Sequence, residues 1–465
     1  MSPRRAPVGG HVDRSRQLSF TFDGRRMVGH PGDTLASALM ASGVSLLGRS
    51  FKYHRPRGIF SAGIEEPNAL VTVLKDGVRE PNIPAASVEL FEGLVAESQN
   101  RFPSLAFDIG AANQLAGPLL SAGFYYKTFM GPVLGPLRGT RFWMFCEWFI
   151  RRAAGLGKAG YERDPARYER MNAFCDVLVV GSGPAGLMAA RTAANAGKQV
   201  ILAEQEPELG GSARWSGETI GTQVASQWAA QSVAELAAMP NVHILPRASV
   251  WGYYDDNTLA AIERVTDHKA RPAPGEPRHR HWTIRAGAVV LATGAHEQPL
   301  IFRNNDLPGV MLSSAAQRLM RHYGVRPGRR AVVYAGDRDG YLAALDLDDA
   351  GVRIAAVIDP EAEDRDGLAP ELARRGVPVM RGCTIRQARG GLHLKAIEVQ
   401  DRQGGRTRLD CDLLVMAGGY TRGYQLALHA GARLSSDDGG TRFSITGVPD
   451  HVHLAGAAAG LSDLA

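Results

Sequence analysis

Hydrophobic and polar residues alternate over residues 17–22, where the sequence QLSFTF is followed by an Asp-Gly pair at 23–24. Because side chains of a strand point alternately to its two faces, this alternation predicts a β-strand. An Asp-Gly pair favours a tight turn, and the sequence RRMVGH at 25–30 resumes the pattern of a strand. The first predicted element is therefore a β-hairpin.

A helix and a third strand complete the first domain. Apolar residues recur at helical spacing through LASALMASG, and Asp33 or Thr34, just before it, can cap the helix. An apolar run at 69–74 predicts another strand. The order strand, strand, helix, strand is typical of ubiquitin-like and ferredoxin-like β-grasp domains, so we predict a small α+β domain over residues 1–100. Such domains often bind a [2Fe–2S] cluster through four cysteines, but the first cysteine is Cys146, so we expect no iron–sulfur cluster.

Residues 101–170 differ from this domain because aromatic residues concentrate at 124–126 and 142–150, with Gly/Pro turns at 131–139. We predict an aromatic-rich helical connector. Its aromatic side chains are interpreted as core residues or as a contact with another protein, since Trp, Tyr and Phe are enriched at interface cores.

From about residue 173 strands and helices alternate. An apolar strand at 176–180 is followed by Gly181, Gly183 and Gly186 in GxGxxG spacing, then by an Ala-rich helix and a second strand that ends at Glu204. The three glycines allow a tight turn, close approach of a pyrophosphate and close packing of helix on strand, and the acidic residue reaches the ribose. This combination predicts a site for an adenine dinucleotide whose phosphates bind at the helix N-terminus.

Two further apolar strands end in small residues that a bound dinucleotide could approach. The first ends at Thr293-Gly294, and the second, at 411–419, ends in Ala-Gly-Gly. We assign both to the first dinucleotide-binding domain, which is predicted to comprise residues 171–300 and 411–465.

A second βαβ unit is predicted between them, in an inserted domain at residues 301–410. Gly336 matches the first glycine of the motif, but Arg338 replaces the second and Tyr341 the third. Side chains at these positions obstruct the pyrophosphate and the close helix packing, so we expect this degenerate site to be empty. The predicted fold class is thus α/β, with two nested Rossmann-like, disulfide-oxidoreductase-like domains after a cluster-free β-grasp domain.

Composition excludes several classes of protein. Apolar residues make up 45% and charged residues 22% of the 465 residues, as in ordinary globular proteins. The net charge is +6, but the arginines are scattered among carboxylates, so we expect no nucleic-acid partner. No apolar run is long enough to cross a membrane, and the N-terminus lacks the apolar core of a signal peptide. We therefore expect a cytoplasmic protein with no membrane contact.

Cysteine and histidine point to no catalytic or metal site. The four cysteines, Cys146, Cys175, Cys383 and Cys411, form no CxxC pair, so we expect no disulfide framework, zinc site or redox dithiol. The histidines are scattered and form no recognisable nucleophilic grouping. The basic segment from Arg49 to Gly58 carries four cations and is interpreted as a solvated loop, a phosphate-binding site or a partner of Glu65 and Glu66.

The segments GDTLASALMASGV, GRSFKYHRPRGIFSAGIEEPNALV, DVLVVGSGPAGLMAARTAANAGKQVILAEQEPELGGS and LATGAHEQPLIFRNNDLPGVML resemble the α subunit of heterotetrameric sarcosine oxidases. The resemblance implies NAD in the first dinucleotide site, FAD in a β subunit where sarcosine is oxidised, FMN at the interface with that subunit, and smaller subunits in the complex. In that family a folate domain follows, whereas the sequence stops at Ala465. The alternatives are a fragment, a shorter relative, and a complex in which the folate domain is a separate chain, so the resemblance does not assign transfer of the one-carbon unit to these residues.

The resemblance also assigns cofactor contacts residue by residue. The expected contacts are Gly181, Ser182, Gly183, Pro184, Ala185, Gly186, Glu204, Gly210, Gly211, Ser212, Val250, Thr293 and Gly294. The resemblance implies an oxidoreductase subunit that demethylates a secondary amine only together with its partner. The alternatives are an FAD-dependent reductase of the pyridine nucleotide-disulfide type, a related amino-acid or opine oxidase subunit, and a non-catalytic scaffold with a structural NAD bound. FAD is the alternative to NAD in the first dinucleotide site.

Overall fold

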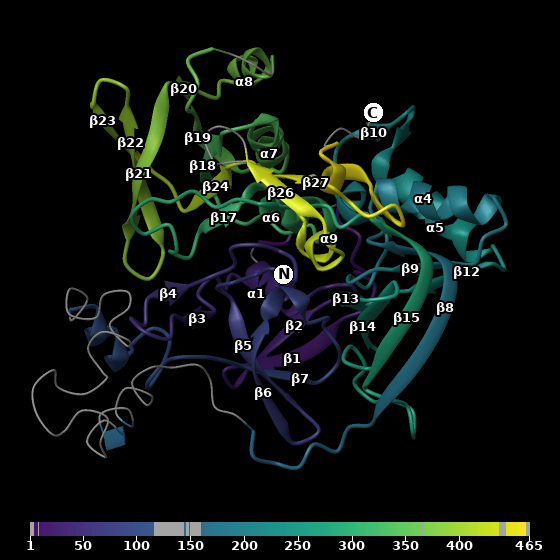
Figure 1. The fold of residues 1–465 in the computed structure, drawn as a ribbon. Coiled ribbons are helices and arrows are strands. Elements are labelled where there is room, and N and C mark those ends of the chain that lie inside the picture. Colours follow the sequence, from purple (N-terminus) through teal and green to yellow (C-terminus); the bar gives the residue numbers. More distant parts are fainter. Residues whose placement is uncertain are drawn as a thin grey trace, which may run out of the picture. The chain divides into compact units, whose positions relative to one another are not determined.

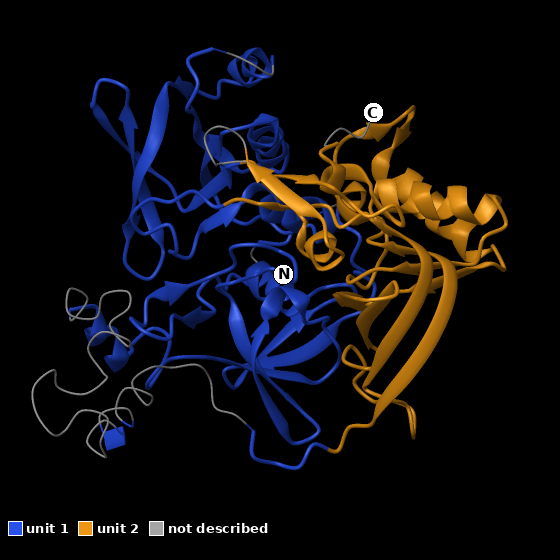
Figure 2. Cartoon of the chain, viewed as in Figure 1, with its two compact units in different colours: residues 1–164, 299–418 blue, residues 165–298, 419–465 orange. Residues whose placement is uncertain are grey.

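The computed structural model describes residues 4–7, 9–115, 144–145, 148, 160–363, 367–436 and 443–461. Contacts divide the chain into two compact units, the first formed by residues 1–164 and 299–418, the second by residues 165–298 and 419–465 (Figure 2). The aromatic residues at 124–126, and most of those at 142–150, lie outside the described residues. None of the described helices is both long and apolar enough to span a bilayer.

The first unit begins with the predicted hairpin, which lies in a five-stranded sheet of order β2-β1-β7-β5-β6. Thr34 caps the helix after the hairpin, and its side chain accepts a hydrogen bond from the Ser37 amide at 3.2 Å. The sequence analysis missed β7, the central strand, which pairs in parallel with β1. The elements of this part are β1 (Leu18–Phe22), β2 (Arg25–Gly29), α1 (Leu35–Ala41), β3 (Gly48–Arg49), β4 (Pro56–Arg57), β5 (Leu70–Lys75), β6 (Val78–Pro84), η1 (Ala85–Ser87), β7 (Leu94–Ser98) and η2 (Ile109–Gln114).

The same unit contains a parallel five-stranded sheet of order β17-β24-β18-β19-β20 and a three-stranded antiparallel sheet (Figure 1). Strand β24 pairs with β17 and β18, although the sequence analysis assigned its residues to the other dinucleotide-binding domain. All five of its residues are buried, and such a run fits the centre of either parallel sheet. The elements are β17 (Val310–Leu312), α6 (Ser313–Gln317), η4 (Arg318–His322), β18 (Arg330–Ala335), α7 (Arg338–Asp349), β19 (Arg353–Asp359), α8 (Ala369–Arg374), β20 (Val379–Arg381), β21 (Cys383–Gly390), β22 (Leu394–Asp401), β23 (Arg406–Asp410) and β24 (Leu413–Ala417).

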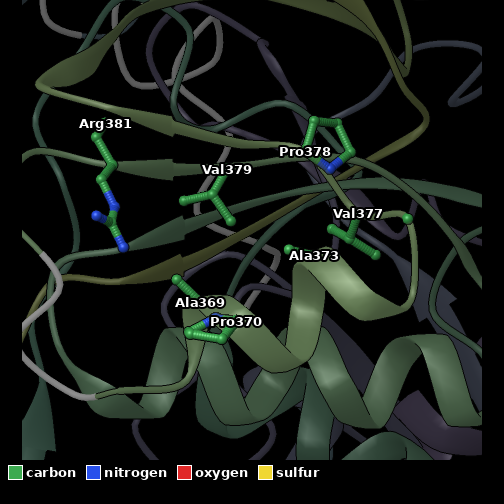
Figure 3. A pocket seen from close by; sticks show the side chains of 8 residues that line it. Ala369, Pro370, Ala373, Val377, Pro378, Val379 and Arg381 are labelled. Carbon is green, nitrogen blue, oxygen red and sulfur yellow. The ribbon is translucent and has the colours of Figure 1, made fainter.

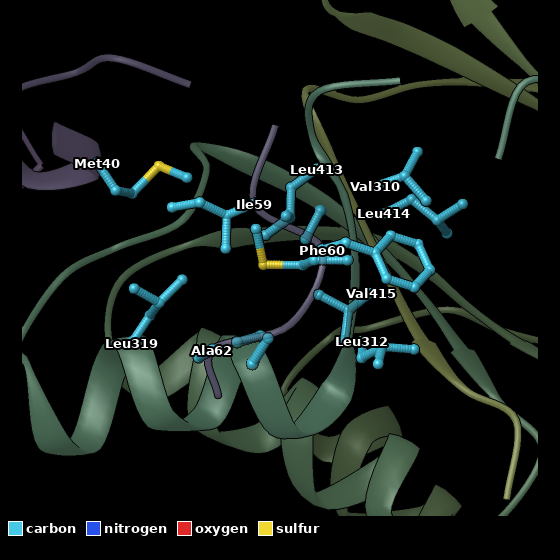
Figure 4. Packing of buried hydrophobic residues seen from close by; sticks show 14 of the residues in the cluster. Met40, Ile59, Phe60, Ala62, Val310, Leu312, Leu319, Leu413, Leu414 and Val415 are labelled. Atoms are coloured by element: carbon cyan, nitrogen blue, oxygen red, sulfur yellow. The ribbon is translucent and has the colours of Figure 1, made fainter. Parts of the chain in front are cut away.

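One hydrophobic core joins these two parts of the first unit. Ile59 and Phe60, from the segment after the β-grasp helix, belong to the same buried cluster as Leu312, Leu319 and Leu413 of the parallel sheet and its helices (Figure 4). The β-grasp residues and the inserted residues therefore form a single packed body.

The basic segment lies against this body and is neither a solvated loop nor paired with Glu65 and Glu66. The Arg55 guanidinium donates two 2.6 Å hydrogen bonds to the Asp306 carboxylate, and Arg57 pairs with the same carboxylate at 2.5 Å. Arg49 is buried and donates to the carbonyl oxygens of His54 and Leu105. These arginines therefore tie residues 49–57 to the rest of their own unit.

The second unit is built on a sheet of order β12-β9-β8-β15-β14-β13, with β28 also paired to β15. Its parallel strands form the Rossmann-like part, and β13, β14 and β15 form an antiparallel meander. Helices α4 and α5 pack on one face through Leu187, Ala229 and Leu236. The elements are β8 (Tyr168–Val180), α4 (Pro184–Asn195), β9 (Val200–Ala203), η3 (Gly211–Arg214), β10 (Thr219–Ile220), β11 (Gln223–Val224), α5 (Ala225–Ala237), β12 (Val242–Leu245), β13 (Ala248–Tyr254), β14 (Thr258–Arg264), β15 (His279–Leu291), β16 (Ala295–Glu297), β25 (Tyr420–Arg422), α9 (Gln425–His429), β26 (Arg433–Ser436), β27 (Phe443–Thr446), β28 (Val452–Leu454) and η5 (Gly456–Ala459).

Candidate dinucleotide-binding site

The turn between β8 and α4 can be made only by glycine at two of its positions. Gly181 has a φ of +96°, and a Cβ there would lie 2.3 Å from the carbonyl oxygen of Ala292. A Cβ on Gly186 would lie 1.9 Å from the carbonyl oxygen of Gly181. Backbone atoms cannot yield by this much, so Gly181 shapes the turn and Gly186 brings the helix against the strand, as the motif predicts.

Gly183 differs from both, because a Cβ on it would meet no atom within 4 Å. It is the N-cap of the twelve-residue helix α4, and Pro184 follows as the first helical residue. The space beside Gly183 is thus open at the point where the helix presents its unpaired amides and positive dipole end. These residues fit the pyrophosphate of a dinucleotide.

Ser182 and Glu204 connect the turn to the end of β9. The Ser182 amide and hydroxyl both donate to Oε2 of Glu204, at 2.9 and 2.5 Å, and the Glu206 amide donates to Oε1 at 2.8 Å. Glu204 is only 7% exposed. A carboxylate offers about four acceptor positions, so about one remains for the predicted ribose hydroxyl.

The predicted residues Gly210 and Gly211 close the other side of the turn. The Gly210 amide donates to the Ser182 carbonyl oxygen at 3.1 Å, and a Cβ on Gly211 would lie 2.8 Å from the Cα of Gly183. Ser212 follows in η3, whose N-cap is Gly210. The structure therefore brings 181–186 and 210–212 together, and their contact with a ligand stays a prediction.

Thr293 and Gly294 lie against a segment that the sequence analysis did not single out. The Thr293 hydroxyl donates to the Gly423 carbonyl oxygen at 2.7 Å, and the Gly423 amide donates to the Gly294 carbonyl oxygen at 2.9 Å. A Cβ on Gly423 would lie 2.9 Å from the Thr293 carbonyl oxygen, which explains why this residue is glycine. No sequence motif marks Gly423, so the sequence analysis could not have identified it.

The strand of Val250 lies beside Glu204, and Gly456, near the C-terminus, lies beside the start of α4. The Ala248 amide, at the start of β13, donates to the Glu204 carbonyl oxygen at 2.7 Å, which places the strand of Val250 beside the acidic residue. A Cβ on Gly456, the first residue of η5, would lie 2.8 Å from the Cβ of Ala185. The helix that follows β28 therefore lies against the start of α4.

The second βαβ unit has a different turn. A Cβ on Gly340 would lie 2.5 Å from the Cα of Ala335, so the close-packing glycine stands one position earlier than the motif comparison places it. Asp337 caps α7, and its side chain accepts a hydrogen bond from the Gly340 amide. A carboxylate of the chain itself thus interacts with this helix N-terminus.

The described thiols are not poised for chemistry. Burial raises the pKa of Cys175 to about 11 and that of Cys411 to about 12, so both are protonated at neutral pH. Cys383 is also free and buried. Within the described ranges no three His, Cys, Asp or Glu side chains lie together as a metal site.

A cavity of about 670 Å³ lies in the first unit between α8 and β20, and none of the predicted cofactor contacts lines it (Figure 3). Ala369, Pro370 and Ala373 line one side, and Val377 and Val379 line the other. Its lining contains Arg381 but no nucleophile or acidic residue, so we assign it no chemistry.

The fold and the glycine turn define a protein of two dinucleotide-type domains, the first of which has open space beside Gly183 at the N-terminus of α4. The chain belongs to the pyridine nucleotide-disulphide oxidoreductase family, whose model matches residues 175–443. This match confirms the predicted α/β fold class.

The chain is similar over its full length to sarcosine oxidase subunit alpha of Rhizobium meliloti strain 1021, with 48% identity. The corresponding subunit of Corynebacterium sp. strain P-1 is 36% identical, also over the full chain. These matches confirm the resemblance predicted from the sequence. The chain covers 46% and 43% of the lengths of these two relatives. Among solved structures, L-proline dehydrogenase from P. horikoshii has a similar fold, with a TM-score of 0.63, 20% identity, and 98% of this chain and 71% of that chain covered.

The comparison with family models also shows that the prediction of no iron–sulfur cluster is wrong. A family model for a 2Fe-2S iron-sulfur cluster binding domain matches residues 15–101, the β-grasp part of the chain. The prediction rested on cysteine positions alone, and the matched residues contain no cysteine. The residues within that range therefore do not supply the thiolates that usually hold such a cluster, and we derive no chemistry through one.

Proposed function

We propose that the chain is the α-type subunit of an amine oxidase complex of the sarcosine oxidase kind, and that it binds an adenine dinucleotide in the turn between β8 and α4. The observation that carries the proposal is the open space beside Gly183 at the N-terminus of α4. Its support from outside the chain is the similarity to the sarcosine oxidase α subunits over its full length.

In this proposal the chain binds and positions the adenine dinucleotide, and a flavin-containing partner subunit oxidises the amine. Sarcosine, oxygen and water would give glycine, formaldehyde and hydrogen peroxide, with flavin as the electron acceptor in or beside the partner. The described residues of this chain offer no activated nucleophile, and their thiols have raised pKa values or no thiol partner. We further expect the complex to work in the cytoplasm, because the cysteines show no disulfide framework.

The structure gives little support to the alternative of a self-sufficient disulfide reductase. Such an enzyme needs a second nucleotide site and a redox dithiol. The chain has no CxxC pair, and in its second βαβ unit Asp337 caps the helix where a phosphate would bind.

The test is to purify the tagged chain from its source organism and to identify what elutes with it. We expect a flavin-containing protein in constant ratio, and hydrogen peroxide formation from sarcosine by the complex but not by the chain alone. Disulfide-dependent NADH oxidation by the chain alone would contradict the proposal.

A further inference from the structure

One face of the second unit's sheet carries large apolar side chains that are exposed. Strands β8, β15, β14 and β13 lie side by side, and β8 and β15 are thirteen residues long (Figure 1). Trp282, Ile284 and Leu259 point to one face and are buried in the core. The residues that alternate with these buried ones along each strand point to the opposite face of the sheet, which we call the aromatic face.

The register places the side chains of the aromatic face in rows across the sheet. Phe174 pairs with Arg285, Arg285 with Thr258, and Thr258 with Tyr254. Trp251, at a β-bulge, has its ring centroid 6.1 Å from that of Tyr254. Phe174 is 76% exposed, Trp251 49% and Tyr254 52%. Exposed aromatic side chains at this density are rare on surfaces that stay in water.

A second row of outward side chains across the sheet contains similar types of residue. Arg170 pairs with His281, and His281 with Ile262, which is also exposed. The ring of His281 lies 5.8 Å from that of Trp251, between centroids. The two rows therefore form one continuous patch of aromatic, aliphatic and basic side chains.

Basic side chains outnumber acidic ones on the aromatic face. Arg170 and Arg285 form no ion pair or side-chain hydrogen bond with any described residue. One carboxylate, Asp176 of β8, stands at an outward position beyond Phe174, and it accepts a hydrogen bond from the Gln199 amide at 2.8 Å. Tyr, Trp, Phe and Arg are enriched in the cores of protein interfaces, and the aromatic face shows the same enrichment.

We propose that the aromatic face is the docking surface for a protein partner that presents carboxylates around an apolar centre. A second copy of this chain fits less well, because face-to-face pairing brings the same arginines together, and the outward carboxylate of Asp176 already accepts a hydrogen bond from the Gln199 amide. The inference rests on the proposed function in one respect, that the chain acts as a subunit.

The experiment compares tagged full-length chains purified from the source organism. Phe174→Asp and Arg285→Glu should each reduce the retained flavin partner at least about tenfold, the effect of losing an interface hot spot. Phe107→Asp is the matched control, since Phe107 is 67% exposed in the other unit, and it should retain the partner. Dinucleotide content should be unchanged in all three variants, which shows that the second unit is folded.

The predicted chemistry of the partner is tested with Arg285→Lys. This variant should retain the partner, and a carbodiimide should join its new amine to an Asp or Glu of the partner, identified by mass spectrometry. Retention of the flavin partner by both Phe174→Asp and Arg285→Glu would overturn the docking surface and leave the proposed function intact. Loss of a flavin-free partner through these variants would support the surface and contradict the function. Absence of any partner of the wild-type chain, a homodimer broken by the variants, or retained nucleic acid would overturn the surface.

Discussion

The hydroxyl of Tyr341 donates a 2.6 Å hydrogen bond to Oδ2 of Asp359 in the second βαβ unit. Tyr341 stands where the sequence motif places its third glycine, and Asp359 ends β19, where a dinucleotide site carries the acid for the ribose. The Glu361 amide donates to the other oxygen of Asp359 at 2.8 Å. Both side chains are buried, so the carboxylate that would bind a ribose is already engaged by the Tyr341 hydroxyl and the Glu361 amide.

The first prediction is that this unit does not support NADH oxidation. The chain alone, with NADH and a dye or a disulfide, should turn over below about 1 s⁻¹, the low end of typical enzymes. Tyr341→Phe should leave this unchanged but lower the free energy of unfolding by about 1–3 kcal/mol, because buried Asp359 loses a donor. Stopped-flow absorbance at 340 nm and urea unfolding measure the two effects. Faster oxidation by the wild-type chain would revive the reductase alternative.

The second prediction separates two glycines of one motif. Gly183→Ala should leave the melting temperature of the ligand-free chain unchanged, because its Cβ enters open space, but should abolish tight dinucleotide binding. Gly186→Ala should lower the stability of the second unit, because its Cβ would lie 1.9 Å from a carbonyl oxygen. Differential scanning calorimetry and quantification of released nucleotide distinguish them. Equal dinucleotide content in Gly183→Ala and wild type would place the phosphates elsewhere.

Sequence patterns predicted those elements whose signal is local. The hairpin of β1 and β2, the Thr34 cap and the turn around Gly181 depend on a few consecutive residues, and the structure contains them. The partners of β7 and β24 depend on residues far away in the chain, and a short buried strand carries no mark of the sheet it joins. The site shows the same division, since Gly423 meets Thr293 across 130 residues.

The interaction partners of the charged residues could also be identified only from the structure. Four cations within residues 49–57 are compatible with a phosphate site, but only the fold shows that Asp306 binds both Arg55 and Arg57. In the same way, Glu204 could be predicted as a ribose acceptor from its spacing, while its bonds to Ser182 depend on how β8 and β9 lie together.

The third prediction concerns pH and the buried carboxyl of Glu66. Burial raises the pKa of Glu66 to about 7, although the amides of Ala69, Asn68, Phe60 and Ser61 all donate to it. Between about pH 4.5 and 7 the folded chain therefore holds a proton that the unfolded chain has lost. The free energy of unfolding should fall as pH rises through this window, by up to about 3 kcal/mol.

Urea unfolding at pH 5 and pH 7.5 measures this dependence. Glu66→Gln should remove that part of the pH dependence, while also lowering stability because its amide nitrogen cannot accept hydrogen bonds. The exposed neighbour Glu65 gives the control, and Glu65→Gln should keep the wild-type slope. A Glu66→Gln chain with the wild-type pH dependence would show that Glu66 is ionised throughout.

The last prediction is that NAD, and not FAD, fills the first site. Dinucleotide flavoproteins of this fold usually end with Ala-Gly-Asp, whose carboxylate holds the ribityl chain, but Ala455 and Gly456 are followed here by Ala457. Losing an acceptor opposite a ribityl hydroxyl costs about 1–3 kcal/mol, which weakens FAD about 5- to 150-fold. The adenosine side keeps Gly183 and Glu204, so a ligand without a ribityl chain loses nothing.

We therefore expect a colourless chain that releases NAD on denaturation. Glu204 should disfavour NADP by repelling its 2′-phosphate, and Glu204→Arg should lose NAD. Because Glu204→Arg also removes the acceptor of Ser182, Ser182→Ala serves as the control: it breaks one of the same hydrogen bonds, keeps the carboxylate and should retain measurable NAD. Chromatography of the released nucleotide decides the case. A yellow chain that releases one FAD would refute the assignment of NAD to the first site. An acceptor other than residue 457 would then have to hold the ribityl chain.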